Sequence, residues 1–171
     1  MTEPALGLAL RKAVLREHGF DAVVMDMGVA LYRRAGPKLR ERMREENGYI
    51  LFDADMAREV VRDRPGVIDD LVGDIVALDA QVIGFTSSIG TSDFTADLCR
   101  RIKRENPRLA LILGGPEASR WRRFSPAGGF GRESSAWEDG LDSIDAIVPG
   151  AEEFPWVELM THHDARGGLR P

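Results

Sequence analysis

Short apolar runs alternate with amphipathic helical segments along this chain, and that alternation limits its fold more than any other feature of the sequence. The runs lie at 22–26, 81–85, 109–113 and 144–148. Apolar runs of about five residues between turn signals are typical of strands buried in a parallel sheet. The sequence therefore predicts an α/β fold: an open, mostly parallel, doubly wound sheet of the Rossmann-like or flavodoxin-like kind, with helices on both faces.

The first helix is predicted over 5–18, where Leu6, Leu10 and Val14 lie at helical spacing with basic residues between them. His18-Gly19 then ends the helix as a C-terminal cap would. Proline and glycine punctuate the later segments in the same way. The remaining predicted helices cover 29–47 with a break at 36–37, 53–62, 65–79 with Pro65 in its first turn, a segment between 92 and 106 with Phe94, Leu98 and Ile102 inward, and 152–160.

Length and composition indicate a single globular domain. With 171 residues, of which 43% are hydrophobic and 30% charged, the chain can bury a core but cannot also hold a full catalytic barrel. We expect the domain to cover 1–160 with a loop insertion at about 119–143, and the tail over 161–171 to be disordered.

The charge balance and the single cysteine exclude several function classes. A formal net charge of -5 gives no general attraction to nucleic acid or to anionic membranes. No apolar run reaches the roughly 20 residues that cross a bilayer, and the start MTEPALGLAL has no signal-peptide pattern, so we expect a cytoplasmic protein. Cys99 alone cannot form an internal disulfide or a zinc or iron–sulfur site built from several cysteines.

Polar residues and glycines follow the predicted strands, where an open α/β sheet binds its ligands. The groups are 86–89 (Thr-Ser-Ser-Ile), 114–117 (Gly-Gly-Pro-Glu), and Gly150 with Glu153. Hydroxyls and unhindered backbone N–H groups suit a ligand with phosphate and amides. Two simpler interpretations stay open: the glycine pair as a plain turn, and the hydroxyl cluster as a helix cap at Thr91 or Ser92.

Five sequence landmarks occur in the order of a known family: ALGLALRKAVLREHGF, VVMDMGVALYRR, VIGFTSSIGTS, LILGGPEAS and IDAIVPGAEE. From about residue 4 to residue 159 the chain resembles the cobalamin-binding domain of cobalamin-dependent radical S-adenosylmethionine enzymes. The residues that carry the resemblance are Leu6-Gly7, Asp26, Tyr32, Gly84-Phe85-Thr86 and the Gly-Gly-Pro-Glu turn at 114–117.

The resemblance implies that cobalamin is the cofactor, held base-off for a radical S-adenosylmethionine partner or for a catalytic domain that this chain lacks. No Asp-x-His-x-x-Gly loop is present to supply a cobalt ligand, so the cobalt is expected to have no protein histidine, and no residue of the chain is assigned as a metal ligand. His18 is interpreted as a helix-end residue, and His162 and His163 as tail residues. We expect no catalytic activity from the chain alone. The implied cofactor-binding residues are Thr86, Ser87, Ser88, Ile89, Gly114, Gly115, Pro116, Glu117, Gly150 and Glu153.

The sequence does not fit two other α/β functions. A response-regulator receiver needs an aspartate and a lysine at strand ends where this chain has Thr86 and Pro149. A dinucleotide-binding domain needs a Gly-x-Gly-x-x-Gly turn after its first strand, and no such turn occurs here. The alternative that stays open is a truncated, cofactor-free remnant acting as a protein-interaction module. Only MTEP precedes the first helix where the family has a strand, so we expect unpaired strand edges and a weakly stable or self-associating chain.

Overall fold

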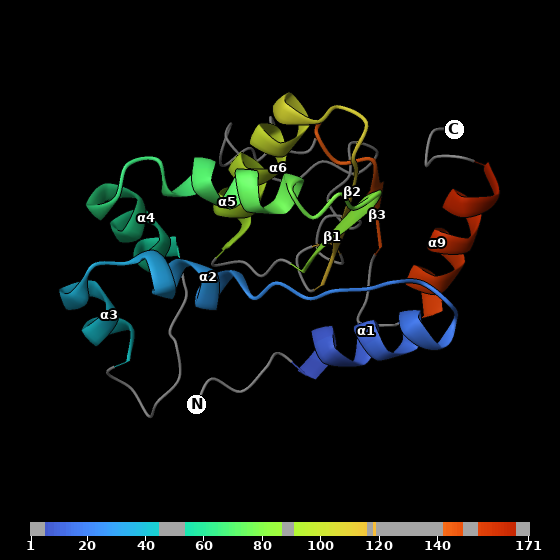
Figure 1. Ribbon diagram of the computed structural model, residues 1–171, viewed down its shortest axis with the longest axis horizontal. Coiled ribbons are helices and arrows are strands. Elements are labelled where there is room, and N and C mark those ends of the chain that lie inside the picture. The colour runs from blue at the N-terminus through green and yellow to red at the C-terminus, as the bar shows by residue number, and fades with distance from the viewer. Residues whose placement is uncertain are drawn as a thin grey trace, which may run out of the picture.

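The computed structural model describes residues 6–44, 54–86, 91–115, 118, 142–148 and 154–166. At its centre is a three-stranded parallel sheet with strand order β1-β2-β3. The strands are β1 (Val82–Thr86), β2 (Ala110–Gly114) and β3 (Ala146–Ile147), and β2 is buried along its whole length. Helices precede β1, connect β1 to β2 and follow β3 (Figure 1), which confirms the predicted α/β class with a parallel sheet.

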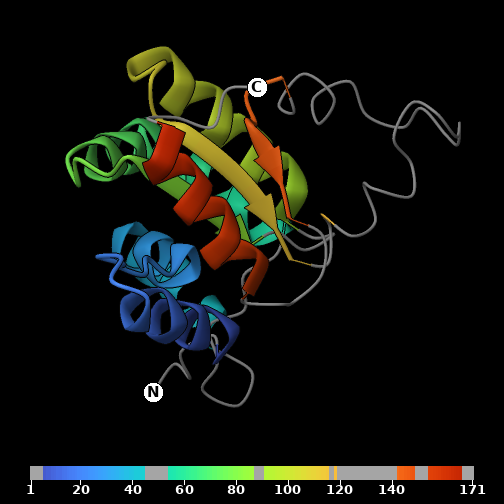
Figure 2. The ribbon, with the colours of Figure 1, turned by 90° about the vertical axis from the view of Figure 1, so that its right-hand side faces the viewer.

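Helices cover both faces of the sheet, as predicted (Figure 2). The helices are α1 (Leu6–Glu17), α2 (Met27–Arg34), α3 (Pro37–Met43), α4 (Ala54–Asp63), α5 (Val67–Val76), α6 (Ser92–Glu105) and α9 (Phe154–Arg166). One face carries the larger hydrophobic core, where Phe85, Leu111 and Leu113 pack against the helices from α2 to α6. The other face carries a smaller cluster of Ile112, Val148 and Trp156, which α1 and α9 cover.

Several predicted helix boundaries are confirmed by their caps. Gly19 has a φ of 86°, and the N–H of Phe20 donates to the carbonyl of Leu15 at 3.0 Å, which is a glycine-type helix end. α2 and α3 separate at Gly36, and α6 ends at Glu105, before Asn106 and Pro107. The prediction of Pro65 in the first turn of α5 is wrong, because that helix begins at Val67.

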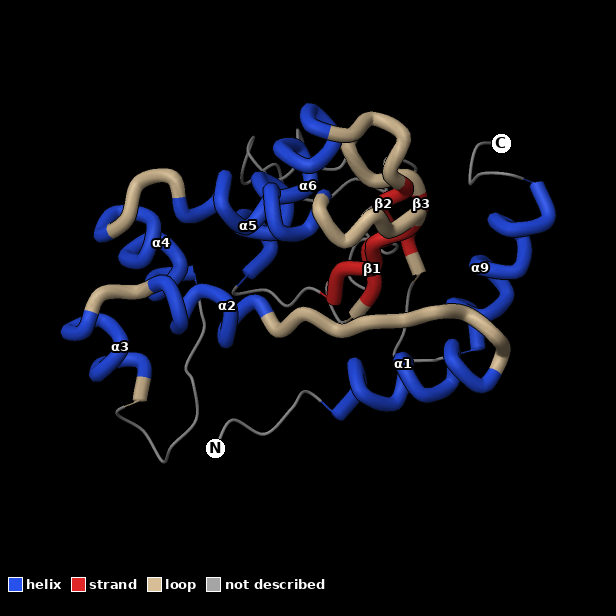
Figure 3. The backbone as a smooth tube through the Cα atoms, viewed as in Figure 1, coloured by secondary structure: helices blue, strands red, loops and turns tan. Residues whose placement is uncertain are grey.

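The strand predicted over 22–26 is absent. Residues 20–26 run as an extended loop from α1 past β1 to α2 (Figure 3), and no described strand pairs with them. Val23 and Val24 keep 62% and 42% of their surface exposed, so the apolar run is not buried as a strand would be. An apolar run becomes a strand only when a neighbouring edge accepts its backbone hydrogen bonds. Here β1 pairs with β2 and with no other described strand.

Two predictions about the terminal helices also need correction. In α1, Leu6 and Leu10 are 81% and 49% exposed, whereas Arg11 is buried and Leu15 packs against the smaller cluster. The inward row of α1 is therefore offset from the predicted leucine stripe. α9 continues through Arg166, so 161–166 are helical where a disordered tail was expected. Within the described residues, no helix is long and apolar enough to cross a membrane.

Candidate functional site

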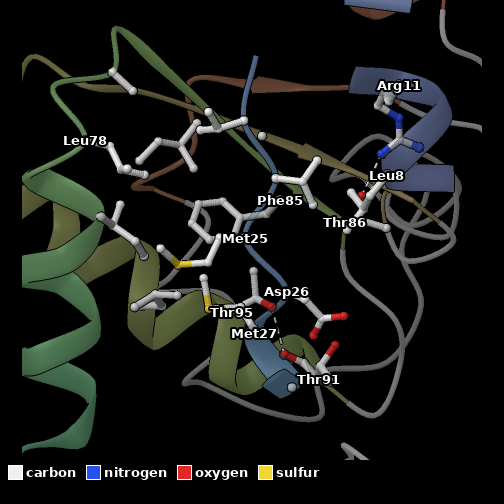
Figure 4. Close-up of a pocket in the computed structure, with 18 of the residues that line it drawn as sticks. Leu8, Arg11, Met25, Asp26, Met27, Leu78, Phe85, Thr86, Thr91 and Thr95 are labelled. Atoms are coloured by element: carbon white, nitrogen blue, oxygen red, sulfur yellow. Dashed lines mark hydrogen bonds between the residues drawn. The ribbon is translucent and has the colours of Figure 1, made fainter. Parts of the chain in front are cut away.

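A pocket of about 610 Å³ lies between the loop at 23–28 and the outer edge of β1. Its wall is mostly apolar, with Met25, Leu78 and Phe85 among the side chains that face it (Figure 4). The polar side chains Asp26, Thr86 and Thr91 lie toward the carboxyl end of β1. A mostly apolar pocket with a few polar groups at one end has the composition of a small-molecule site.

Local hydrogen bonds fix the polar groups of this pocket. Asp26 caps α2, since its Oδ1 accepts a hydrogen bond of 3.0 Å from the N–H of Val29. Thr91 occupies the N-cap position of α6 without a side-chain capping hydrogen bond, and its carbonyl accepts a bond of 2.9 Å from Oγ1 of Thr95. The cap interpretation of the hydroxyl cluster is therefore right for the position of Thr91 and wrong for its side chain.

Arg11 brings a positive charge to the end of β1, and sequence reasoning missed it. It projects from α1, is only 8% exposed, and donates from a terminal guanidinium nitrogen to Oγ1 of Thr86 at 2.6 Å (Figure 4). Its guanidinium carbon also lies 5.3 Å from the centre of the Trp156 ring, within cation–π range. In the sequence, Arg11 is indistinguishable from the basic residues that a helix exposes to solvent.

Two strand glycines make room for the ring of Trp156. A Cβ on Gly84 would lie under 3.0 Å from two atoms of that ring, and one on Gly114 would lie 2.7 Å from a third. The ring is 4% exposed, and its Nε1, which lies toward Gly114, has no hydrogen-bond partner in the described structure. A glycine inside a strand often marks a close approach by another group, so the sequence did carry a signal here.

Three of the predicted cofactor-binding residues lie in the described structure, and they meet at one end of the sheet. Thr86 pairs in register with Gly114, and Gly115 follows directly. Gly115 has a φ of 89°, a conformation that favours glycine, so the turn itself requires this residue. Gly114 faces the ring of Trp156 in this structure, and its predicted role is to let the ligand tail pass close to the backbone. The other predicted residues, Ser87, Ser88, Ile89, Pro116, Glu117, Gly150 and Glu153, lie outside the described residues.

The titratable residues show no metal centre in the described part of the chain, where no three His, Cys, Asp or Glu side chains gather. Cys99 is fully buried, and burial raises the pKa of its thiol to about 12, so it is a poor nucleophile and a poor metal ligand at neutral pH. His18 lies at the exposed end of α1 with its Nδ1 2.8 Å from the carbonyl of Val14, which agrees with the helix-end interpretation.

Comparison with known protein families identifies the family of this domain. The sequence model of the B12 binding domain matches residues 1–130. The chain belongs to the B12-binding domain family. That membership indicates cobalamin as the ligand of this domain. No curated protein and no solved structure matches the chain significantly.

The described residues of this B12-binding domain suit parts of cobalamin. The buried guanidinium of Arg11 and the hydroxyl of Thr86 can donate hydrogen bonds to a phosphate, which the nucleotide tail of cobalamin contains. The turn at Gly115, which has no side chain of its own, lets a bulky ligand approach the backbone closely. Donors and close backbone approach are what the tail requires.

Proposed function

We propose that this B12-binding domain is a cytoplasmic module that holds a base-off corrinoid for a radical S-adenosylmethionine partner or catalytic domain. The observation that supports it best is the meeting of Thr86, Gly114 and Gly115 at the carboxyl end of neighbouring parallel strands, with Arg11 bonded to Thr86. We place the nucleotide tail there, between the loops that begin at Thr86 and at Gly114. The corrin supplies the cobalt chemistry, and the chain binds and orients it.

The positions of the histidines support a cobalt without a protein ligand. His18 follows the C-terminal end of α1, seven residues beyond Arg11, and its Nδ1 lies 2.8 Å from the carbonyl of Val14 in that helix. His162 and His163 lie on α9, and none of the three histidines lines the pocket beside β1. The buried Cys99 also offers no iron–sulfur ligand, so radical chemistry in this proposal comes from the partner.

Electron paramagnetic resonance of bound cob(II)alamin tests the base-off proposal. Without an axial nitrogen, the cobalt lines should show no nitrogen superhyperfine splitting. A triplet splitting that survives replacement of all three histidines would mean that the base stays on the cobalt. A splitting that disappears with one of those replacements would mean that a histidine binds the cobalt. Either result would contradict this state of the cofactor.

Substitution at Gly115 tests the placement of the tail. Gly115→Leu puts a bulky side chain where the tail should pass and should weaken hydroxocobalamin binding by at least about tenfold, the effect of roughly 1.4 kcal/mol. The φ of 89° strains any β-carbon, so Gly115→Asn is the matched control, since asparagine tolerates this conformation and is smaller. If Gly115→Leu bound hydroxocobalamin as tightly as the parent chain does, this placement of the tail would be wrong.

The alternative function, a cofactor-free interaction module, is favoured by one observation. β1 has no described partner on its outer edge, and the exposed Val23 and Val24 lie beside that edge in the loop that lines the pocket. Unpaired strand edges with apolar flanks accept strands from other chains. Failure of the purified chain to bind any corrinoid, together with concentration-dependent association, would favour this alternative over cobalamin binding.

A further inference from the structure

We propose that Trp156 is a built-in competitor for the nucleotide tail of cobalamin: its indole occupies the space against Gly84 and Gly114, and the aromatic base of the tail takes that space when cobalamin binds. The inference rests on the proposed base-off binding. In that form the benzimidazole base has left the cobalt, and a flat bicyclic aromatic group then needs a buried site of its own.

The shape of the sheet face supports this assignment. The register pairs Gly84 with Ile112 and Thr86 with Gly114, so both glycines present the same face of the sheet on adjoining strands. Each glycine leaves the space of a side chain empty, and the indole ring fills both spaces together. The indole is itself a flat bicyclic ring. The surface that accepts it therefore matches a benzimidazole in shape and in apolar character.

Among the described residues, the indole N–H of Trp156 lacks the hydrogen-bond partner that a buried tryptophan normally has. Buried donors are normally paired, yet Nε1 of this 4% exposed ring has no partner in the described structure. The guanidinium of Arg11 lies over the ring and also bonds to Thr86 at the strand end. One cation thus joins the aromatic site to the hydroxyl at the proposed position of the tail phosphate. An incoming nucleotide offers both groups, a base for the ring space and a phosphate for Arg11.

One of the helices that cover this face of the sheet, α9, is also held by the smaller of the two hydrophobic clusters. Trp156 belongs to a buried cluster with Ile112 and Val148, whereas the opposite face holds the main core of the domain. α9, which carries Trp156, packs against α1. Release of the indole can therefore leave the main core intact.

The test compares hydroxocobalamin with cobinamide, which has the same corrin and lacks the nucleotide tail. Trp121→Phe with Trp137→Phe leaves Trp156 as the sole tryptophan. Cobalamin should shift its emission maximum to the red as the indole leaves the sheet, and cobinamide should not. Absorption by the corrin affects both titrations alike, so the position of the maximum is the informative readout.

Equilibrium dialysis of Trp156→Ala provides the second readout. The parent chain binds the tail only in the fraction of molecules whose indole has left the site, and that fraction lowers the apparent affinity. Without the indole every molecule is competent, so cobalamin binding should tighten by at least about tenfold. Affinity for cobinamide should stay unchanged. Leu159→Ala is the matched control, since Leu159 lies on α9 and packs against the same cluster without facing the glycines. It should change neither affinity.

Binding of both corrinoids without a red shift specific to cobalamin would overturn the inference and leave the proposed function standing. The same holds if Trp156→Ala binds cobalamin no more tightly than Leu159→Ala does. If no variant bound either corrinoid, the proposed function would fail and this inference with it. Should Trp156→Ala not fold, the emission measurement decides alone, because it keeps residue 156 unchanged.

Discussion

Replacing Gly84 by alanine should destabilise the domain through a single clash with Trp156. The new Cβ would lie under 3.0 Å from two ring atoms, and the ring is 4% exposed, so it cannot move without leaving its cluster. Overpacking of a buried site costs about 1–3 kcal/mol. The alanine also restricts the unfolded chain, which returns about 0.4–1 kcal/mol. We expect a net loss of about 1–2 kcal/mol in the free energy of unfolding, measured by urea denaturation with circular dichroism.

Two further variants isolate the clash. Gly73→Ala, inside α5, places its Cβ in open space and should stabilise the domain by roughly 0.5–1 kcal/mol. Trp156→Leu removes the ring, so Gly84→Ala should cost little in that background, and the double-mutant cycle should return a coupling of about 1–2 kcal/mol. If Gly84→Ala had the same effect with and without the ring, the described contact between Gly84 and Trp156 would be refuted.

Three other outcomes follow from the structure. Burial raises the pKa of Cys99 from 9.0 to about 12, so the native thiol should resist iodoacetamide until urea unfolds the chain. Because the folded state favours the neutral thiol, its contribution to the free energy of unfolding is fully present below pH 9.0 and is lost as the pH rises toward 12. The chain should self-associate in light scattering. Val24→Lys lies beside the edge of β1 that no described strand covers, and it should reduce association more than Leu6→Lys on α1, although both side chains are exposed. Asp26→Ala should lower the free energy of unfolding by about 0.5–2 kcal/mol in a urea titration, because the N–H of Val29 loses its cap.

Periodicity and turn residues predicted the helices and the three paired strands. The boundary at Asn106 and Pro107, for example, follows from local sterics and needs no knowledge of the rest of the chain. The strand predicted at 22–26 was wrong for the opposite reason, because strand formation depends on the rest of the chain. Its apolar residues suit a strand, but the backbone at 20–26 runs past the outer edge of β1 without pairing with it, and no local pattern encodes that path.

The sequence predicted those site residues that the local backbone conformation requires. It did not predict those that only the fold brings together from distant parts of the chain. Gly114 and Gly115 were identified from their place after a strand, and the φ of Gly115 gives a physical reason for that glycine. Arg11 was missed because a basic residue on a helix normally faces solvent. Trp156 was missed because it lies 42 residues beyond Gly114 in sequence, and only the fold brings its ring over that strand.

Binding of hydroxocobalamin to the purified chain tests the central claim most directly. Equilibrium dialysis, with the corrinoid quantified by its visible absorption, should show saturable binding of one corrinoid per chain. Cobinamide should bind more weakly, because it cannot supply the nucleotide tail for which Thr86, Gly114 and Gly115 are positioned. Absence of saturable binding by a folded chain, at corrinoid concentrations well above those of the protein, would contradict cobalamin binding by this domain.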